Sequence, residues 1–359
     1  MQSRQFLKEN MKKLTLKSVL KGRKKSDESP SRITNETVAE HREKILAGGR
    51  RFKYPIQYAR HKLVINALVI VVASVAVLAL LGWWQLYSVQ NSSTFLYRVT
   101  RIIPVPVASV DGESVPFGDY LVKYRGSEYY MSKYSEEKLD SADGKKQLDH
   151  FKRVALNSAI ADAYAQKLAR INNVTINDKD VDAVIDLQRN TANGRITEET
   201  FYASSRMLYD WSPDDYRSQL SRSILRSRVA FAIDKTAVER ETKAATLLGE
   251  NNNDFRLVAS LMGGEGNAKV QAGVSGPVDI TGTFGGLQVS EVAKVPKGTV
   301  SSVLLTSTDG GYYYVRVLDK NEKQINFEYL HIPLTEFANQ LARLKADGKI
   351  HEYIAVPKE

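Results

Sequence analysis

Few side chains in this sequence have the types and spacing that catalysis or metal binding requires. The chain has no cysteine, which excludes disulfides, thiolate metal ligands and cysteine nucleophiles. No nucleophile stands with a matching base, and the stretch 263–269 lacks the spacing and the trailing Ser or Thr of a phosphate-binding loop. The histidines follow no metal-ligand spacing; they are His41, His61, His150, His331 and His351. We therefore expect no cofactor, no metal and no catalytic residue of these classes.

The positive charge of the chain is confined to its N-terminal part. Residues 1–62 hold 17 Lys and Arg against 6 Asp and Glu, a net charge of +11, whereas the whole chain has +10. A protein that binds nucleic acid would normally carry its basic patch on a folded domain. The distribution predicts a basic tail with no nucleic-acid partner, and such a tail is attracted to anionic lipid beside a membrane.

The segment Leu63–Trp84 contains 22 residues without a charge. At about 1.5 Å per residue, a helix of this length spans about 33 Å, enough for the hydrocarbon core of a bilayer. Trp83, Trp84 and Tyr87 lie at one end of it, where amphipathic rings prefer the headgroup region. The segment is thus expected to form a transmembrane helix that anchors the chain in the membrane.

The position of this segment sets the expected topology. A cleaved signal peptide has a shorter apolar core near the N-terminus, so we interpret residues 63–86 as an uncleaved transmembrane signal anchor. The positive-inside rule leaves residues 1–62 in the cytoplasm as a basic tail and puts the C-terminal bulk outside. The expected localisation is the cell membrane, single-pass, with extracytoplasmic C-terminal domains.

The residues beyond the anchor are expected to form a linker and a first, mostly helical domain. Residues 87–104 are interpreted as a linker, because the X-Pro steps at its end favour extended backbone. The domain at 105–236 opens with a short strand broken by an Asp-Gly turn. An apolar stripe over 145–171 predicts an amphipathic helix, and residues 177–180 predict the start of a second. The cap and proline at Ser212-Pro213 predict the start of another helix that could continue past Thr236.

Residues 237–359 are expected to form a second domain that contains strands. Glycines recur after residue 263, and the expected elements are strands at 300–305, 312–318 and 325–333, a hairpin turn at Asp309-Gly310-Gly311, a helix around 335–345 and a last strand at 350–356. Alternation places Tyr313, Val315 and Val317 on one sheet face. The predicted fold class is α+β behind a single transmembrane helix.

Several motifs, in their order, are similar to those of SurA-like and PpiD-like membrane-anchored chaperones. Residues 107–113 resemble the opening strand and turn of the SurA N-terminal domain, and 174–181 resemble the corner after its next helix. Residues 211–217 look like one of its later helices. Residues 254–318 resemble a parvulin-type prolyl isomerase; the motifs that carry this likeness are Asp254–Ala259, Val295–Ser301 and Gly311–Val317.

The parvulin-like segment departs from the family pattern at its two sheet histidines. The position on the last strand is Tyr313. The family's first strand is absent, because Thr236–Glu250 reads as a helix. The segment Ile325–Ile332 could fill the vacant position as a permuted strand, and it would bring Tyr329 or His331 there. The domain at 237–359 is therefore interpreted as a degenerate parvulin-like domain, in which this strand can be permuted.

The resemblance implies a pocket that binds a proline-containing segment of substrate. The candidate residues are Phe284, Leu287, Tyr313, Tyr329 and His331. Isomerisation needs neither a metal nor a covalent intermediate, since an apolar pocket and hydrogen bonds to the twisted amide suffice. Because a tyrosine cannot replace a titratable imidazole, we expect peptidyl-prolyl isomerase activity to be weak or absent.

Two functional hypotheses remain open at this point. The first is a membrane-tethered extracytoplasmic chaperone or foldase that binds exported, unfolded polypeptides. The alternative is a non-catalytic envelope scaffold that holds a defined protein partner. A cluster of Tyr129, Tyr130, Met131 and Tyr134 on one expected helix could line a groove for unfolded segments, although core packing explains it equally well.

Overall fold

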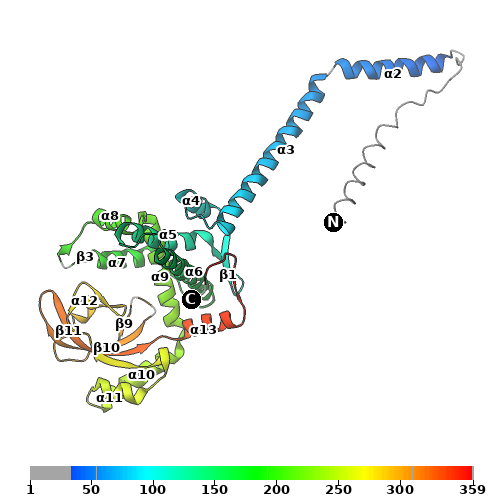
Figure 1. The fold of residues 1–359 in the computed structure, drawn as a ribbon. Helices are drawn as coiled ribbons and strands as arrows, with labels where there is room; N and C mark the ends of the chain where they lie inside the picture. The colour runs from blue at the N-terminus through cyan, green and yellow to red at the C-terminus, as the bar shows by residue number, and fades with distance from the viewer. Residues whose placement is uncertain (1–33, 54, 192, 307, 309, 358–359) are drawn as a thin grey trace, which may run out of the picture. The chain divides into compact units, whose positions relative to one another are not determined.

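The computed structural model describes residues 34–53, 55–191, 193–306, 308 and 310–357; most of the basic tail therefore lies outside the described residues. The chain divides into two compact units, Met1–Leu78 and Ala79–Glu359. Helix α2 (Asn35–Lys53) belongs to the first unit, and the boundary between the units in the chain falls within helix α3 (Pro55–Trp83). Both helices are labelled in Figure 1.

The apolar segment forms a single helix, as the sequence predicts. The stretch Lys62–Ser88 comprises α3 from Lys62 onward and a π-helical turn at Trp84–Ser88, and its 27 residues are long and apolar enough to cross a membrane. Side chains from Lys62 to Leu81 are exposed, whereas the core helix of a soluble protein would bury them. By length and composition this is a candidate transmembrane helix.

The helical part of the second unit, here named the helical module, comprises residues 86–233 and 334–356. Its elements up to residue 233 are α4 (Thr94–Ile102), β1 (Pro106–Val110), β2 (Glu113–Pro116), α5 (Phe117–Tyr134), α6 (Ala142–Ile171), α7 (Asp178–Gln188), β3 (Asn190–Thr191), β4 (Gly194–Arg195), α8 (Glu198–Tyr209) and α9 (Pro213–Ile233). Asn177 and Ser212 each form a capping box, which confirms the helix starts predicted there. Helix α9 stops at Ile233 and does not continue past Thr236.

Part of the expected linker is folded into this module. Helix α4 begins at the Ser93 cap, and its Leu96 side chain is buried in the same core as Val107 and Phe117. The linker expected over 87–104 therefore contains a helix capped by Ser93. Ile103, which precedes Pro104, has the extended backbone that the X-Pro step favours.

The C-terminal segment returns to the helical module. Helix α13 (Glu336–Ala346) packs Phe337 against Tyr164, with ring centroids 5.8 Å apart. Strand β12 (Ile350–Glu352) pairs with β1, so the small sheet has the order β12-β1-β2. Both elements were expected in the second domain, whose own core is built from residues before 334.

Residues 235–333 form the second part, here named the sheet module. Its elements are α10 (Lys235–Glu250), α11 (Phe255–Met262), a 3-10 turn (Gly266–Ala268), β5 (Gln271–Val274), β6 (Val278–Asp279), β7 (Thr283–Phe284), β8 (Leu287–Gln288), α12 (Val289–Val292), β9 (Leu304–Leu305), β10 (Gly311–Lys320) and β11 (Gln324–Pro333). The strand order is β5-β11-β10-β9, with β6 also paired to β11. The strand expected over 300–305 pairs only at β9 and at a Val300–Arg316 bridge. Asp309 of the expected turn lies outside the described residues.

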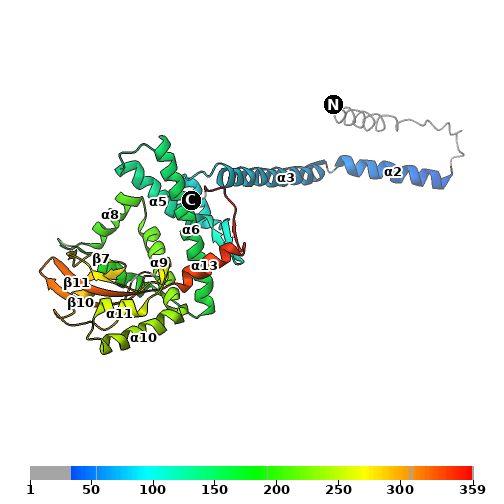
Figure 2. The ribbon, with the colours of Figure 1, turned by 60° about the horizontal axis from the view of Figure 1, so that its bottom comes forward.

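The sheet separates two apolar layers. Tyr314, Leu330 and Ile332 face α10 and α11, which Figures 1 and 2 show together on one side of β10 and β11. Val315 and Phe327 lie in the opposite layer with α12. The alternating faces predicted from the sequence are therefore confirmed.

One buried carboxylate lies where the chain passes between the modules. Asp234 is 1% exposed, and its Oδ1 accepts a hydrogen bond from the Ala237 backbone N–H at the start of α10. Its Oδ2 accepts from the N–H groups of Thr335 and Glu336, at 2.6 and 3.0 Å, where the chain enters α13. Asp234 thus caps α10 and α13, and it links the two points at which the chain passes between the modules.

Candidate functional site

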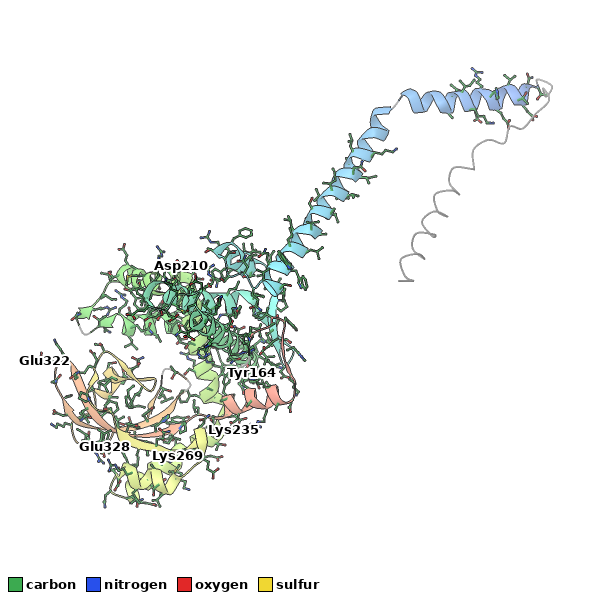
Figure 3. All side chains as sticks on the ribbon, in the orientation of Figure 1. Tyr164, Asp210, Lys235, Lys269, Glu322 and Glu328 are labelled. Atoms are coloured by element: carbon green, nitrogen blue, oxygen red, sulfur yellow. The ribbon has the colours of Figure 1, made fainter. Side chains whose placement is uncertain are left out.

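The register of β10 and β11 assembles the predicted pocket residues. The two strands are antiparallel, with Tyr313 opposite His331 and Val315 opposite Tyr329. Because alternate residues share a face, Tyr313, Tyr329 and His331 all lie on the side away from α10 and α11. On the covered side, Arg316 pairs with Glu328, which Figure 3 labels, at 2.9 Å.

The β7–β8 hairpin supplies the other two candidates. Phe284 packs against Tyr329 with ring centroids 5.1 Å apart, and Leu287 is 1% exposed in the same cluster. The turn at Gly285-Gly286 has positive φ at both glycines. A Cβ at Gly285 would collide with the Tyr313 hydroxyl, so this glycine allows the turn to lie directly on the tyrosine.

All five predicted residues therefore lie together, but they differ in access. Tyr313 is 4% exposed and Leu287 is buried, so these two belong to the floor. Phe284, Tyr329 and His331 are half-buried and form the accessible rim. We name the five residues the aromatic face. Sequence reasoning missed Phe327, whose ring meets Phe284 edge-on at 5.3 Å, although its spacing of two from Tyr329 indicates the same side.

Burial shifts the pKa of two polar rings of the aromatic face, Tyr313 and His331, away from neutral pH. Tyr313 and His331 stack with centroids 4.4 Å apart and an interplanar angle of 17°. Burial, with the nearby Tyr329, raises the pKa of Tyr313 to about 12. Burial lowers the pKa of His331 below 6.5, and its hydrogen bond to the Gly310 carbonyl only partly opposes this. Because a carbonyl only accepts, Nε2 of His331 is the donor at 2.8 Å.

This arrangement is suited to apolar binding and not to proton transfer. The stacked pair of Tyr313 and His331 offers π surface and one committed donor, and the pKa of each ring is moved away from neutral pH. Among the described residues, no group of three or more His, Asp or Glu is placed to hold a metal ion.

A second aromatic surface lies on the helical module. Tyr130 of α5 contacts Tyr134 and Tyr209, with centroids 5.3 and 6.1 Å apart. The Tyr134 hydroxyl donates to the Met207 carbonyl of α8 at 3.1 Å. Tyr130, Tyr134 and Met207 are exposed, whereas Met131 is buried in the fold. The predicted cluster is thus divided: we name Tyr130, Tyr134, Met207 and Tyr209 the tyrosine patch.

Comparison with known protein families gives one result. Residues 56–230 match the family model of the SurA-like N-terminal domain. This part of the chain is similar to SurA-like N-terminal domains. The match covers the apolar helix and the helical module as far as α9, just under half of the chain. Such domains are associated with chaperones of periplasmic protein folding, which supports a chaperone family and the binding of unfolded polypeptides in general. No curated protein and no solved structure matches the chain.

Proposed function

We propose that this protein is a membrane-tethered extracytoplasmic chaperone that binds unfolded, exported polypeptides. The observation that carries the proposal is the match to the SurA-like domain, which includes the whole candidate transmembrane helix. The charge of residues 1–62 supports a cytoplasmic N-terminus, since positive residues flank the inner end of a span. The two modules would then face the compartment that receives exported chains.

The tyrosine patch is the surface best suited to clients. Exposed Tyr130 and Tyr134 offer large amphipathic rings with few rotatable bonds, and Met207 adapts to varied shapes. The contacts between α5 and α8 hold these side chains on two helices of the SurA-like domain. A surface of this kind can bind many sequences without requiring one.

The aromatic face supports a degenerate parvulin-type domain with weak or absent isomerase activity. Strand β11 lies between β5 and β10, beside the last strand of the parvulin-like segment, and this position supports its interpretation as a permuted strand. Tyr313 and His331 are neutral and stacked, in place of a histidine pair. Binding the ground and transition states equally gives no acceleration, so affinity for proline segments can persist without catalysis.

The client-binding proposal is tested with the full chain in nanodiscs. The triple variant Tyr130→Ser, Tyr134→Ser and Met207→Ser should lose most of its ability to slow the aggregation of an unfolded client, measured by light scattering. Leu187→Ser, which changes an exposed leucine on α7, is the matched control and should retain it. Equal protection by both proteins would contradict a role for the tyrosine patch.

The isomerase deficit is tested on the same protein. We expect exchange NMR to show less than about tenfold acceleration of cis–trans exchange in a Xaa-Pro peptide, a barrier change under about 1.4 kcal/mol. A large acceleration that Tyr313→Phe or His331→Ala abolishes would make the protein a working isomerase.

The alternative is a non-catalytic envelope scaffold with one defined partner. The same exposed surfaces support it, because rigid aromatic anchors are also typical of specific interfaces. Crosslinking in intact cells followed by mass spectrometry separates the two hypotheses. Many unrelated exported chains would indicate a chaperone, whereas one or two stoichiometric partners would indicate a scaffold.

A further inference from the structure

The outer end of the apolar helix is part of the folded module. Leu86 is buried in the core of the helical module. The Tyr87 hydroxyl donates to the Pro106 carbonyl at 2.5 Å, and its ring meets that of Phe117 edge-on at 5.6 Å. The module is therefore attached to the end of the apolar helix by packing as well as by the chain.

The next segment folds back onto this end. The backbone N–H of Asn91 donates to the Gln85 carbonyl at 3.0 Å, and the Asn91 side-chain amide donates to Gln85 Oε1 at 2.9 Å. Ser93 then caps α4. Helix α4 thus begins beside the last turn of the apolar helix, and a bilayer that contains this helix has its surface close to α4.

The two faces of α4 differ in what they contact. Leu96 and Thr100 are buried inward. The opposite stripe, at spacings of three and four residues, carries Phe95, Arg98 and Ile102; Phe95 is 72% exposed and Ile102 is 82% exposed. Two large apolar side chains at such exposure are costly in water, and a helix with this pattern is typical of a membrane interface.

We propose that the outward face of α4 lies in the anionic headgroup surface of the membrane that α3 enters. The inference rests on the membrane tether of the proposed function and adds a second contact to it. The exposed rings of Trp83 and Trp84 mark the same interface at the end of the apolar helix. Phe95 and Ile102 enter the acyl boundary, and Arg98 between them reaches anionic headgroups.

The experiment uses the absence of cysteine from the chain. Single spin labels are attached to Phe95→Cys and Ile102→Cys in the full-length protein, reconstituted in nanodiscs of phosphatidylcholine and phosphatidylglycerol. Power-saturation EPR then compares collisions with oxygen, which dissolves in lipid, and with a nickel chelate, which stays in water. Labels at Leu187→Cys and Leu261→Cys, two exposed leucines elsewhere in the second unit, are the matched controls.

We expect the ratio of oxygen to nickel collisions to be several-fold higher at positions 95 and 102 than at 187 and 261. The ratio at 95 and 102 should fall when phosphatidylglycerol is omitted or when Arg98→Gln is added. A label at Val72→Cys reports the tether itself. Lipid contact at 72 together with water contact at 95 and 102 would overturn the membrane contact of α4 but leave the transmembrane helix intact. Water contact at 72 would overturn the transmembrane helix itself.

Discussion

The core of the helical module draws on both ends of the described second unit, whereas the sheet module is built from one continuous stretch. Leu86 and Leu96 enter the first core from the membrane side, and Ile354 and Val356 enter it from the C-terminus. The two layers of the sheet module use only residues 244–332. The helical module should therefore depend on distant segments that the sheet module can lose without effect.

Deleting residues 334–359 should have the largest effect on this contrast. The deletion removes Phe337, Leu344, Ile354 and Val356 from the helical core, each worth about 1.5–3 kcal/mol of burial. The sum is comparable with the whole stability of a domain. Hydrogen exchange with mass spectrometry should show protection lost across α5, α6 and α9 but kept in β10 and β11. Loss of protection in both modules would mean that they form one cooperative unit.

Asp234→Ala should have an intermediate effect, because it removes the cap of two helices at once. At about 1 kcal/mol for each lost cap, we expect roughly 2 kcal/mol or more of destabilisation. Asp254→Ala removes the cap of α11 alone and should cost about half as much. Thermal unfolding of the two variants in nanodiscs measures the difference. Equal destabilisation by the two substitutions would show that the hydrogen bonds from Asp234 to the start of α13 add nothing to the capping of α10.

The smallest effect concerns His331 and pH. Burial lowers the pKa of this imidazole in the folded state, so the unfolded chain binds the proton more readily. Its contribution to stability is complete above the ordinary value of 6.5, and it is lost as the pH falls from there through the folded-state pKa. His331→Gln should flatten the pH profile of the sheet module's unfolding in this window. An unchanged profile would show that the histidine is not buried in solution.

Local signals in the sequence predicted the elements well. The helix starts at Asn177 and Ser212 follow from cap chemistry, which acts within one turn. The period of two in Tyr313, Val315 and Val317 gave the correct sheet face, and with it the assembly of the aromatic face.

The placement of distant segments could not be predicted in the same way. The apolar pattern of α13 shows that one face is buried, but it carries no information about which core receives it. Likewise the exposure of Tyr130 and the burial of Met131 depend on how α8 packs against α5, although the two residues are adjacent in the sequence.

The double cap at Asp234 also has a consequence for the order of folding. The helical module can complete its core only after a loop of roughly 100 residues, 235–333, has closed, at an entropic cost of about 4 kcal/mol for a flexible chain. If the sheet module folds first, its own compactness brings the loop ends near each other, and Asp234 then needs only to find the amides of Thr335 and Glu336. A sheet module that folds first would thus lower the kinetic barrier to folding of the helical module that surrounds it.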